Sequence, residues 1–250
     1  MANELICGRN AVAELLKSGR TVDTVYISSE DGKRLSYIAS LAKSRGAVVK
    51  NVPRYKLDKM CRGEKHQGVA AYASETEYRD VSDMLELARS RGEDPFIVIT
   101  DGIEDPHNLG AIIRTAECAG AHGVVFPKRG GTTITEAVQK ASAGAASTIM
   151  LARVANIPET IRRLKEEGLF VYCADMDGTY CADVDMTGPC AVVVGSEGRG
   201  VSRLAKEVSD ETVSLPIKGS VNSLNASVAA GAVIYEIVRQ RINKFRGKQQ

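Results

Sequence analysis

The sequence lacks any segment that is long and apolar enough to cross a membrane. No run approaches eighteen consecutive apolar residues, and the first twenty residues carry Glu4, Arg9 and Glu14 where a secretion signal needs an unbroken apolar stretch. Internal repeats and low-complexity segments are missing as well. We therefore expect a cytoplasmic protein with no membrane association.

Metal-binding patterns are also missing. The six cysteines include no C-x-x-C pair, and none of the three histidines stands at ligand spacing from a cysteine. In a chain without a secretion signal we interpret the cysteines as reduced thiols that mostly pack as small core residues, and we expect no metal site. The cysteines stand at positions 7, 61, 118, 173, 181 and 190.

What is present is an ordinary globular composition with an uneven charge distribution. The 250 residues, 44% hydrophobic and 26% charged, suffice for two small domains or one large one and exclude a disordered or fibrous chain. Residues 43–65 hold eight Lys or Arg and two acids, a local net charge of +6, and the segment from Ile237 onward adds five basic residues and no acid. Two basic patches indicate a polyanionic partner, although charge alone fits solvated helix faces equally well.

Hydrophobic periodicity divides the chain into two α/β domains. Residues 1–75 alternate short helical and strand patterns, and residues 76–94 form a polar, acidic linker with one helix over 81–91. From 95 to 250, short apolar strands alternate with helices, which predicts a parallel sheet covered on both faces. Ligands of such sheets bind at the carboxyl ends of the strands, so the loops there are the candidate sites.

The first of these loops runs from Thr100 to Arg114. Asn108 stands where a helix N-cap belongs, and the residues after it form an apolar helical stripe. Arg114 lies off that stripe, about one and a half turns into the predicted helix, so that its side chain can reach back to the loop. A plain cap and a plain surface charge are the simpler interpretations of either residue alone.

Two further loops combine glycine with polar residues. Gly195–Gly200 has the spacing G-x-x-G-x-G, which permits close approach of a ligand but matches neither the dinucleotide fingerprint nor a phosphate-binding P-loop. Glu197 is an unusual residue for a plain glycine turn. Residues 215–227 place Ser and Asn at the start of a long amphipathic helix, where they offer hydrogen-bond donors to an anionic or polar ligand.

Together these loops resemble the three ordered motifs of the SpoU-type RNA ribose 2′-O-methyltransferases, in the SPOUT superfamily. The matching segments are DxxxDPxNxGxxxRTAxxxG, VVxGSEGxG and LPIxGxxxSLNxSxAxxxxxYE, within residues 95–241. Residues 1–75, which end near His66-Gln-Gly-Val, resemble the ribosomal-protein-type RNA-binding domain that many members carry. Within the family the chain is most similar to the bacterial 23S ribosomal RNA guanosine 2′-O-methyltransferases.

The resemblance implies an α/β knot, that is, a parallel sheet with helices on both faces and a deep trefoil knot. It also implies S-adenosylmethionine as methyl donor, RNA as substrate, and a homodimer. The expected donor-binding residues are Gly195, Gly198, Leu215, Ile217 and Leu224. The expected catalytic residues are Asn108, Arg114, Glu197, Ser223 and Asn225. The expected RNA-binding residues are Lys50, Arg54, Lys56, Lys59 and Arg62.

A ribose 2′-hydroxyl is a poor nucleophile, so positioning and proton removal are the enzyme's main tasks. The family proposal makes the arginine, here Arg114, the base. An isolated guanidinium does not deprotonate in proteins. We therefore favour a role in which Arg114 grips the phosphate beside the target ribose and polarises its hydroxyl. His107 has no counterpart in the family pattern, and a role for His66 stays open.

Other functions fit less well. A nucleotide-binding dehydrogenase or kinase lacks its fingerprint here. A non-catalytic ribosome assembly factor is disfavoured because Asn108, Arg114, Glu197 and Asn225 are all present. Transfer RNA remains an alternative substrate, and the N-terminal domain favours ribosomal RNA over it.

Overall fold

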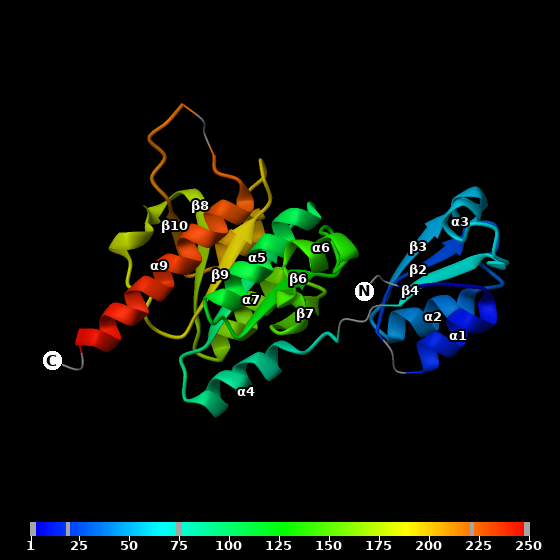
Figure 1. The fold of residues 1–250 in the computed structure, drawn as a ribbon, viewed down its shortest axis with the longest axis horizontal. Coiled ribbons are helices and arrows are strands. Elements are labelled where there is room, and N and C mark those ends of the chain that lie inside the picture. The colour runs from blue at the N-terminus through cyan, green and yellow to red at the C-terminus, as the bar shows by residue number, and fades with distance from the viewer. Residues whose placement is uncertain (1–3, 19–20, 74–76, 221–222, 248–250) are drawn as a thin grey trace. The chain divides into compact units, whose positions relative to one another are not determined.

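The chain forms two units in the computed structural model, which describes residues 4–18, 21–73, 77–220 and 223–247 (Figure 1). Backbone contacts assign Met1–Glu77 to unit 1 and Tyr78–Gln250 to unit 2. We describe each unit by itself.

Unit 1 is a four-stranded sheet with helices on both faces. Its strand order is β1-β4-β2-β3, with β2 and β3 parallel and β4 antiparallel to both of its neighbours. Apolar residues of α1 and α2 pack on one face, and Leu57 of α3 packs on the other. The elements are β1 (Glu4–Cys7), α1 (Arg9–Lys17), β2 (Val22–Ser28), α2 (Ser36–Ser44), β3 (Val48–Val52), α3 (Arg54–Met60) and β4 (Val69–Ala73).

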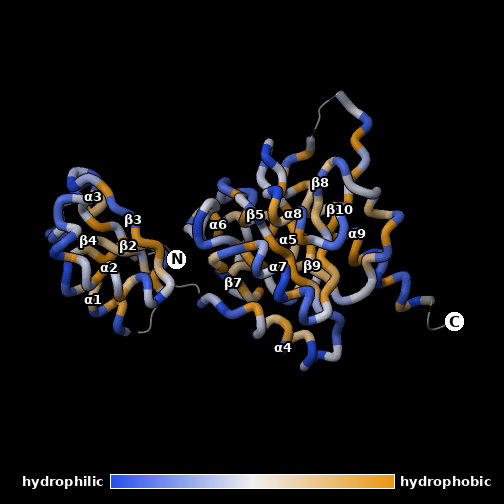
Figure 2. Tube along the Cα trace, turned by 180° about the vertical axis from the view of Figure 1, so that it is seen from behind, coloured by the Kyte–Doolittle hydropathy of each residue, from blue (hydrophilic) through white to orange (hydrophobic). Residues whose placement is uncertain are grey.

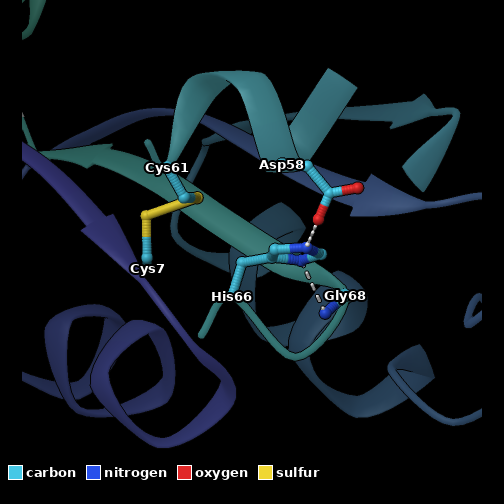
Figure 3. The surroundings of a disulfide bond; sticks show 5 residues. All are labelled: Cys7, Asp58, Cys61, His66 and Gly68. Carbon is cyan, nitrogen blue, oxygen red and sulfur yellow. Dashed lines mark hydrogen bonds and ion pairs between the residues drawn. A yellow bond between two sulfur atoms is a disulfide. The ribbon is translucent and has the colours of Figure 1, made fainter. Parts of the chain in front are cut away.

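A disulfide joins Cys7, at the end of β1, to Cys61, directly after α3 (Figure 3). The expectation that all cysteines are reduced thiols is therefore wrong for this pair. The two residues are 54 positions apart, and only the packing of α3 on the sheet brings their Cα atoms within 6.3 Å. Of the other cysteines, three are buried and Cys118 is exposed. Burial raises the pKa of the Cys173 thiol to about 12.

Unit 2 is a six-stranded parallel sheet in the order β10-β8-β9-β5-β6-β7. This confirms the predicted parallel sheet, and Figure 2 shows hydrophobic residues concentrated in the strands. Because the chain runs from β5 toward β6 and β7 and then returns on the other side, the strand order reverses between β5 and β9. Such a switch point is where open α/β sheets bind ligands. The strands are β5 (Phe96–Asp101), β6 (Gly123–Pro127), β7 (Met150–Val154), β8 (Phe170–Tyr180), β9 (Cys190–Gly195) and β10 (Glu211–Ser214).

Helices cover both faces of this sheet. One core forms between the sheet and α5, α6 and α9, and a second between the sheet and α4, α7 and α8. Strand residues alternate between the two cores, since Phe96 and Val98 join the first and Ile97 and Ile99 the second. The helices are α4 (Val81–Arg91), α5 (Pro106–Cys118), α6 (Glu136–Ala141), α7 (Ile157–Glu166), α8 (Arg203–Val208) and α9 (Ala226–Gly247).

Helix α4 lies in the segment 76–94 that the sequence predicts as a linker. In the structure its residues Met84, Leu85 and Ala88 are buried against unit 2. Glycine at position 123 of β6 leaves room for this packing, because a Cβ there would lie 2.2 Å from the sulfur of Met84 and the methionine would have to shift. Residues 78–94 are therefore part of the folded unit rather than a free connection.

The basic patch predicted from Ile237 onward is mostly engaged within the protein. Arg241 donates to the carbonyl oxygens of Pro95 (3.1 Å) and Gly188 (2.7 Å) and so ties α9 to the start of β5. Arg239 pairs with Glu236 at 2.6 Å. Arg241 is thus turned toward the protein's own carbonyl groups, and polyanion binding by the rest of the segment stays a prediction. Lys248 lies outside the described residues.

Neither membrane-spanning nor metal-binding features occur in the part of the chain that the structure describes. No described helix is both long and apolar enough to cross a membrane. No three described His, Cys, Asp or Glu side chains gather as metal ligands.

Candidate active site

A cavity of about 330 Å³ opens at the carboxyl ends of β9 and β10, beside the middle of β8 and the start of α9. Sequence reasoning missed Asp175, Met176, Ala229 and Val233 in its wall, although the first two directly follow the part of β8 that pairs with β9. The wall includes all five predicted donor-binding residues, Gly195, Gly198, Leu215, Ile217 and Leu224, and two predicted catalytic residues, Glu197 and Ser223.

An acidic group borders this mostly apolar cavity. The Asp175 carboxylate pairs with Lys206 at 3.3 Å, and Lys206 also donates to Asp177 at 2.6 Å. The hydrogen bond from Lys206 holds the pKa of Asp177 below its usual value, and the same bond raises the pKa of Lys206. The lysine thus fixes these two carboxylates of β8, while the side chains of Leu215 and Leu224 supply apolar surface.

The glycines of the loop 195–200 allow close contacts within the backbone of the loop itself. Ser196 and Gly200 exchange two backbone hydrogen bonds, at 3.1 and 2.9 Å. A Cβ at position 195 would lie 2.0 Å from the carbonyl carbon of Gly200, so only glycine lets the chain cross itself here. The predicted close approach at Gly195 is therefore to the loop itself. Gly198 adopts φ +81, a left-handed conformation that glycine favours.

Three polar side chains from the three loops meet at the mouth of the cavity. Asn108 Nδ2 donates to Glu197 Oε1 at 3.0 Å, and Asn225 Nδ2 donates to Asn108 Oδ1 at 3.0 Å. Asn225 Nδ2 also donates to Glu197 Oε1, and Ala226 N donates to the same oxygen at 3.3 Å. One carboxylate oxygen thus accepts three N–H groups, which fixes the side chain of Glu197. We call Asn108, Glu197 and Asn225 the polar triad.

The start of α9 gives the triad a rigid support. Asn225 Oδ1 accepts from the backbone N–H groups of Ser227 (3.0 Å) and Val228 (3.3 Å) and from the Ser227 hydroxyl (2.6 Å). This is N-capping geometry, as the Ser- and Asn-rich segment predicts. Because its oxygen caps the helix, the amide N–H₂ of Asn225 is directed at Asn108 and Glu197.

Asn108 is not the N-cap of its own helix. Helix α5 begins at Pro106, and Asp105 caps it by accepting from His107 N at 2.9 Å. Asn108 therefore occupies the third helical position and is buried, which frees its amide for the triad. The earlier helix start also moves Arg114 to more than two turns from the helix beginning.

Arg114 is not brought into the triad. Six residues along a helix turn the side-chain direction by about 240° and advance it by about 9 Å, so Arg114 and Asn108 face different ways. Arg114 is exposed and has no hydrogen bond or ion pair to another described residue. The other four predicted catalytic residues, Asn108, Glu197, Ser223 and Asn225, lie around the 330 Å³ cavity or in the triad at its mouth.

A second cavity, of about 190 Å³, adjoins the first. It lies between the loops that follow β5 and β9, and it shares Ser196 and Glu197 with the larger cavity. An ion pair between Arg199 and Glu104, at 3.0 Å, joins the two loops. Asn108 and Glu197 thus stand where two ligands would meet.

The predicted RNA-binding residues are all exposed, on β3, on α3 and in the turn after it. Helix α3 is oriented by the buried His66, whose Nδ1 accepts from Gly68 N at 3.0 Å and whose Nε2 lies 2.8 Å from Asp58 (Figure 3). A proton on Nε2 completes both hydrogen bonds. The residues are Lys50, Arg54, Lys56, Lys59 and Arg62. His66 thus positions the basic helix rather than a reacting group.

A parallel sheet with adjoining cavities at its switch point defines a ligand-binding α/β domain. The family model described as "SpoU rRNA Methylase family" matches residues 95–235, and the model "RNA 2'-O ribose methyltransferase substrate binding" matches residues 5–79. The chain belongs to the SpoU family of RNA methyltransferases.

Individual relatives agree with this assignment. The chain is 43% identical to a putative TrmH family tRNA/rRNA methyltransferase, YacO, of Bacillus subtilis, with 96% of each chain covered. It is 42% identical to a protein of the same description from Staphylococcus haemolyticus, over 96% of this chain and 97% of the relative. The SpoU methyltransferase AviRb of Streptomyces viridochromogenes, solved in complex with AdoMet, matches with a TM-score of 0.62 at 25% identity, over 96% of this chain and 90% of that chain.

Proposed function

We propose that the protein transfers the methyl group of S-adenosylmethionine to the 2′-hydroxyl of a ribose in RNA, with a guanosine of 23S ribosomal RNA as the target. The observation that carries this proposal is the polar triad between two cavities that share Ser196 and Glu197. A transferase needs two adjoining ligand sites, and only positioned groups at their junction can act on both ligands.

The larger cavity suits the methyl donor. Its volume of about 330 Å³ falls in the range of small-molecule sites, and its lining is mostly apolar with few polar groups. Leu215, Ile217 and Leu224 would hold the adenine, and the backbone of the loop 195–200 would hold the polar parts of the donor. When bound, S-adenosylmethionine supplies a methyl group already activated by its sulfonium.

The smaller cavity then takes the acceptor ribose. Glu197 Oε1 is occupied by three donors, whereas no described residue donates to its other oxygen, Oε2. Oε2 would accept the hydrogen bond of the 2′-hydroxyl and take its proton as the methyl group leaves the donor's sulfur and bonds to that oxygen. Arg114 grips a neighbouring phosphate, since its guanidinium fork matches that group and has no partner among the described residues.

A homodimer fits the exposed surface of unit 2. Helix α9 exposes Val228, Tyr235 and Ile242 at seven-residue intervals, with Phe245 65% exposed beyond them. A second copy of the chain would cover this apolar face. The trefoil knot implied by the motifs stays a prediction.

The experiment combines methyl transfer with mapping. Purified protein, tritiated S-adenosylmethionine and unmodified ribosomal or transfer RNA should give label only in ribosomal RNA, at a ribose that resists alkaline cleavage. Mapping of 2′-O-methyl groups in cells with and without the gene should identify the same nucleotide. Label in transfer RNA alone would select the alternative substrate, and label on a base would refute ribose methylation. Donor binding without any transfer would favour the assembly factor.

A further inference from the structure

Unit 1 contains a polar cavity of about 200 Å³ in which three arginines converge from three elements. Arg9 stands at the start of α1, Arg34 in the turn before α2, and Arg54 at the start of α3. Among the described residues, Asp31 is the only carboxylate in the cavity wall, which is completed by Leu35 and Gln67. Three guanidinium groups against one carboxylate leave a net charge of +2. Only Arg54 is among the RNA-binding residues predicted from the sequence.

Contacts of Asp31, Gly68 and Gln67 within unit 1 shape the cavity. Asp31, whose side chain is only 17% exposed, pairs with Arg54 at 3.3 Å and accepts two backbone N–H groups, from Arg34 and Leu35, through its carbonyl oxygen. A Cβ at Gly68 would lie 2.6 Å from the Asp31 carboxylate, so glycine there leaves room for it. Gln67 Oε1 accepts from Arg9 N at 3.1 Å and thereby fixes the start of α1.

Two of the three arginines in this cavity, Arg9 and Arg34, have no counter-charge among the described residues. The side chains of Arg9 and Arg34 make no hydrogen bond or ion pair with another residue in the described ranges, and the carboxylate of Asp31 is already paired with Arg54. Like charges brought together repel each other, and an anion between them removes that cost. Guanidinium groups arranged around a space match a phosphate, whose oxygens accept paired N–H donors.

We propose that this cavity binds a phosphodiester group of the RNA substrate and so sets where unit 1 grips the RNA. The proposal rests on the proposed function only in taking RNA as the substrate. It places the main phosphate contact on three elements rather than along the basic stretch that includes Lys56 and Lys59.

The test uses the full chain and the double variant Arg9→Gln/Arg34→Gln, which leaves the Asp31–Arg54 pair intact. Binding of a fluorescein-labelled, unmethylated 23S ribosomal RNA transcript is measured by anisotropy at several salt concentrations. Loss of two phosphate contacts should lower the log–log salt slope by about 1.4–1.8. It should also weaken affinity by at least about tenfold at low salt.

The matched control is Lys17→Gln/Lys33→Gln. It removes the same charge from exposed positions of unit 1 that do not line the cavity. Its slope should stay that of the wild type. Equal losses in both variants would mean that only net charge matters and would overturn the proposal. The variant Arg9→Lys/Arg34→Lys keeps both charges and should have the wild-type salt slope. A slope as low as that of Arg9→Gln/Arg34→Gln would also overturn the proposal.

Donor binding and methyl transfer separate this proposal from the function itself. Wild-type protein that neither binds S-adenosylmethionine nor methylates RNA would refute the proposed function. If the wild type methylates RNA and the Arg9→Gln/Arg34→Gln variant keeps the wild-type salt slope, only the proposed phosphate binding in this cavity is refuted. The wild type and the Arg9→Gln/Arg34→Gln variant should bind S-adenosylmethionine with the same affinity, because every residue of the donor cavity lies in unit 2.

Discussion

The two units of this protein present their polar residues in opposite ways. In unit 2, Asn108, Glu197 and Asn225 satisfy one another, so that one carboxylate oxygen holds three N–H groups. In unit 1, Arg9 and Arg34 line a cavity without a described partner for either side chain. A catalytic site needs side chains that are held in place before the substrate binds. A phosphate-binding site instead needs positive side chains that the protein itself does not neutralise. The variants below test this difference, from the largest expected effect to the smallest.

Removing the triad's carboxylate should have the largest effect. We expect Glu197→Gln to lower methyl transfer by about 10²–10³-fold, because the junction of the two cavities loses its fixed negative oxygen. Affinity for RNA through unit 1 should not change. A tritium transfer assay beside RNA anisotropy measures both, and near-normal transfer would show that the triad is only structural.

Arg114→Ala should also abolish most transfer while donor affinity changes little, because the guanidinium is assigned to RNA. Arg114→Lys keeps the charge but loses the fork, and it should remain strongly impaired. Calorimetric titration with S-adenosylmethionine and single-turnover transfer assays separate the two steps. Normal transfer by Arg114→Lys would remove the bidentate role.

Gly195→Val should damage the donor cavity through the loop rather than by touching the donor. The added side chain would overlap the backbone of Gly200, so the loop cannot close, and donor affinity should fall by at least about tenfold. Gly188→Ala is the control, since a Cβ there meets nothing within 4 Å. An unchanged donor affinity in Gly195→Val would contradict the placement of the cavity.

The disulfide should stabilise unit 1. We expect Cys7→Ser to lower its free energy of unfolding by about 2–4 kcal/mol, since the cross-link restricts the unfolded chain. Denaturant unfolding under non-reducing conditions measures this, with the exposed Cys118→Ser as control. Titration of the denatured, non-reduced wild type should find four thiols. Six thiols would show that the pair is reduced.

The smallest effect concerns His122 in unit 2. Its Nδ1 accepts from Phe96 N at 3.0 Å, and burial, partly offset by Glu93, lowers its pKa from 6.5. The unfolded state then binds more protons below about pH 6.5, so stability falls as the pH drops through that range. The Tm should drop by roughly 2–4 °C more in wild type than in His122→Asn between pH 7.5 and 5.5.

Local sequence signals predicted the elements well but not their neighbours in space. The alternating helical and strand patterns of residues 1–75 predicted the α/β elements of unit 1, and the apolar strands after residue 95 predicted the parallel sheet. The helix cap at Asp105 was missed because Asp-Pro-His-Asn offers two capping residues three positions apart, and the sequence does not say which of them the helix uses. The segment 76–94 was predicted to be a linker because most of its residues are polar or acidic. Only three residues of α4, Met84, Leu85 and Ala88, are buried.

The sequence by itself determined the family, through three motifs whose order and spacing few other chains share, and it placed Asn108, Glu197 and Asn225 in loops at the ends of strands. Only the tertiary structure decided that these three side chains bond to one another, that Arg114 faces elsewhere, and that Cys7 lies beside Cys61. It also brought Arg9 and Arg34 to Arg54. The physical reason is that helix and strand periods act over a few residues, whereas these groupings join positions 20 to 117 residues apart, and packing alone sets which of them meet.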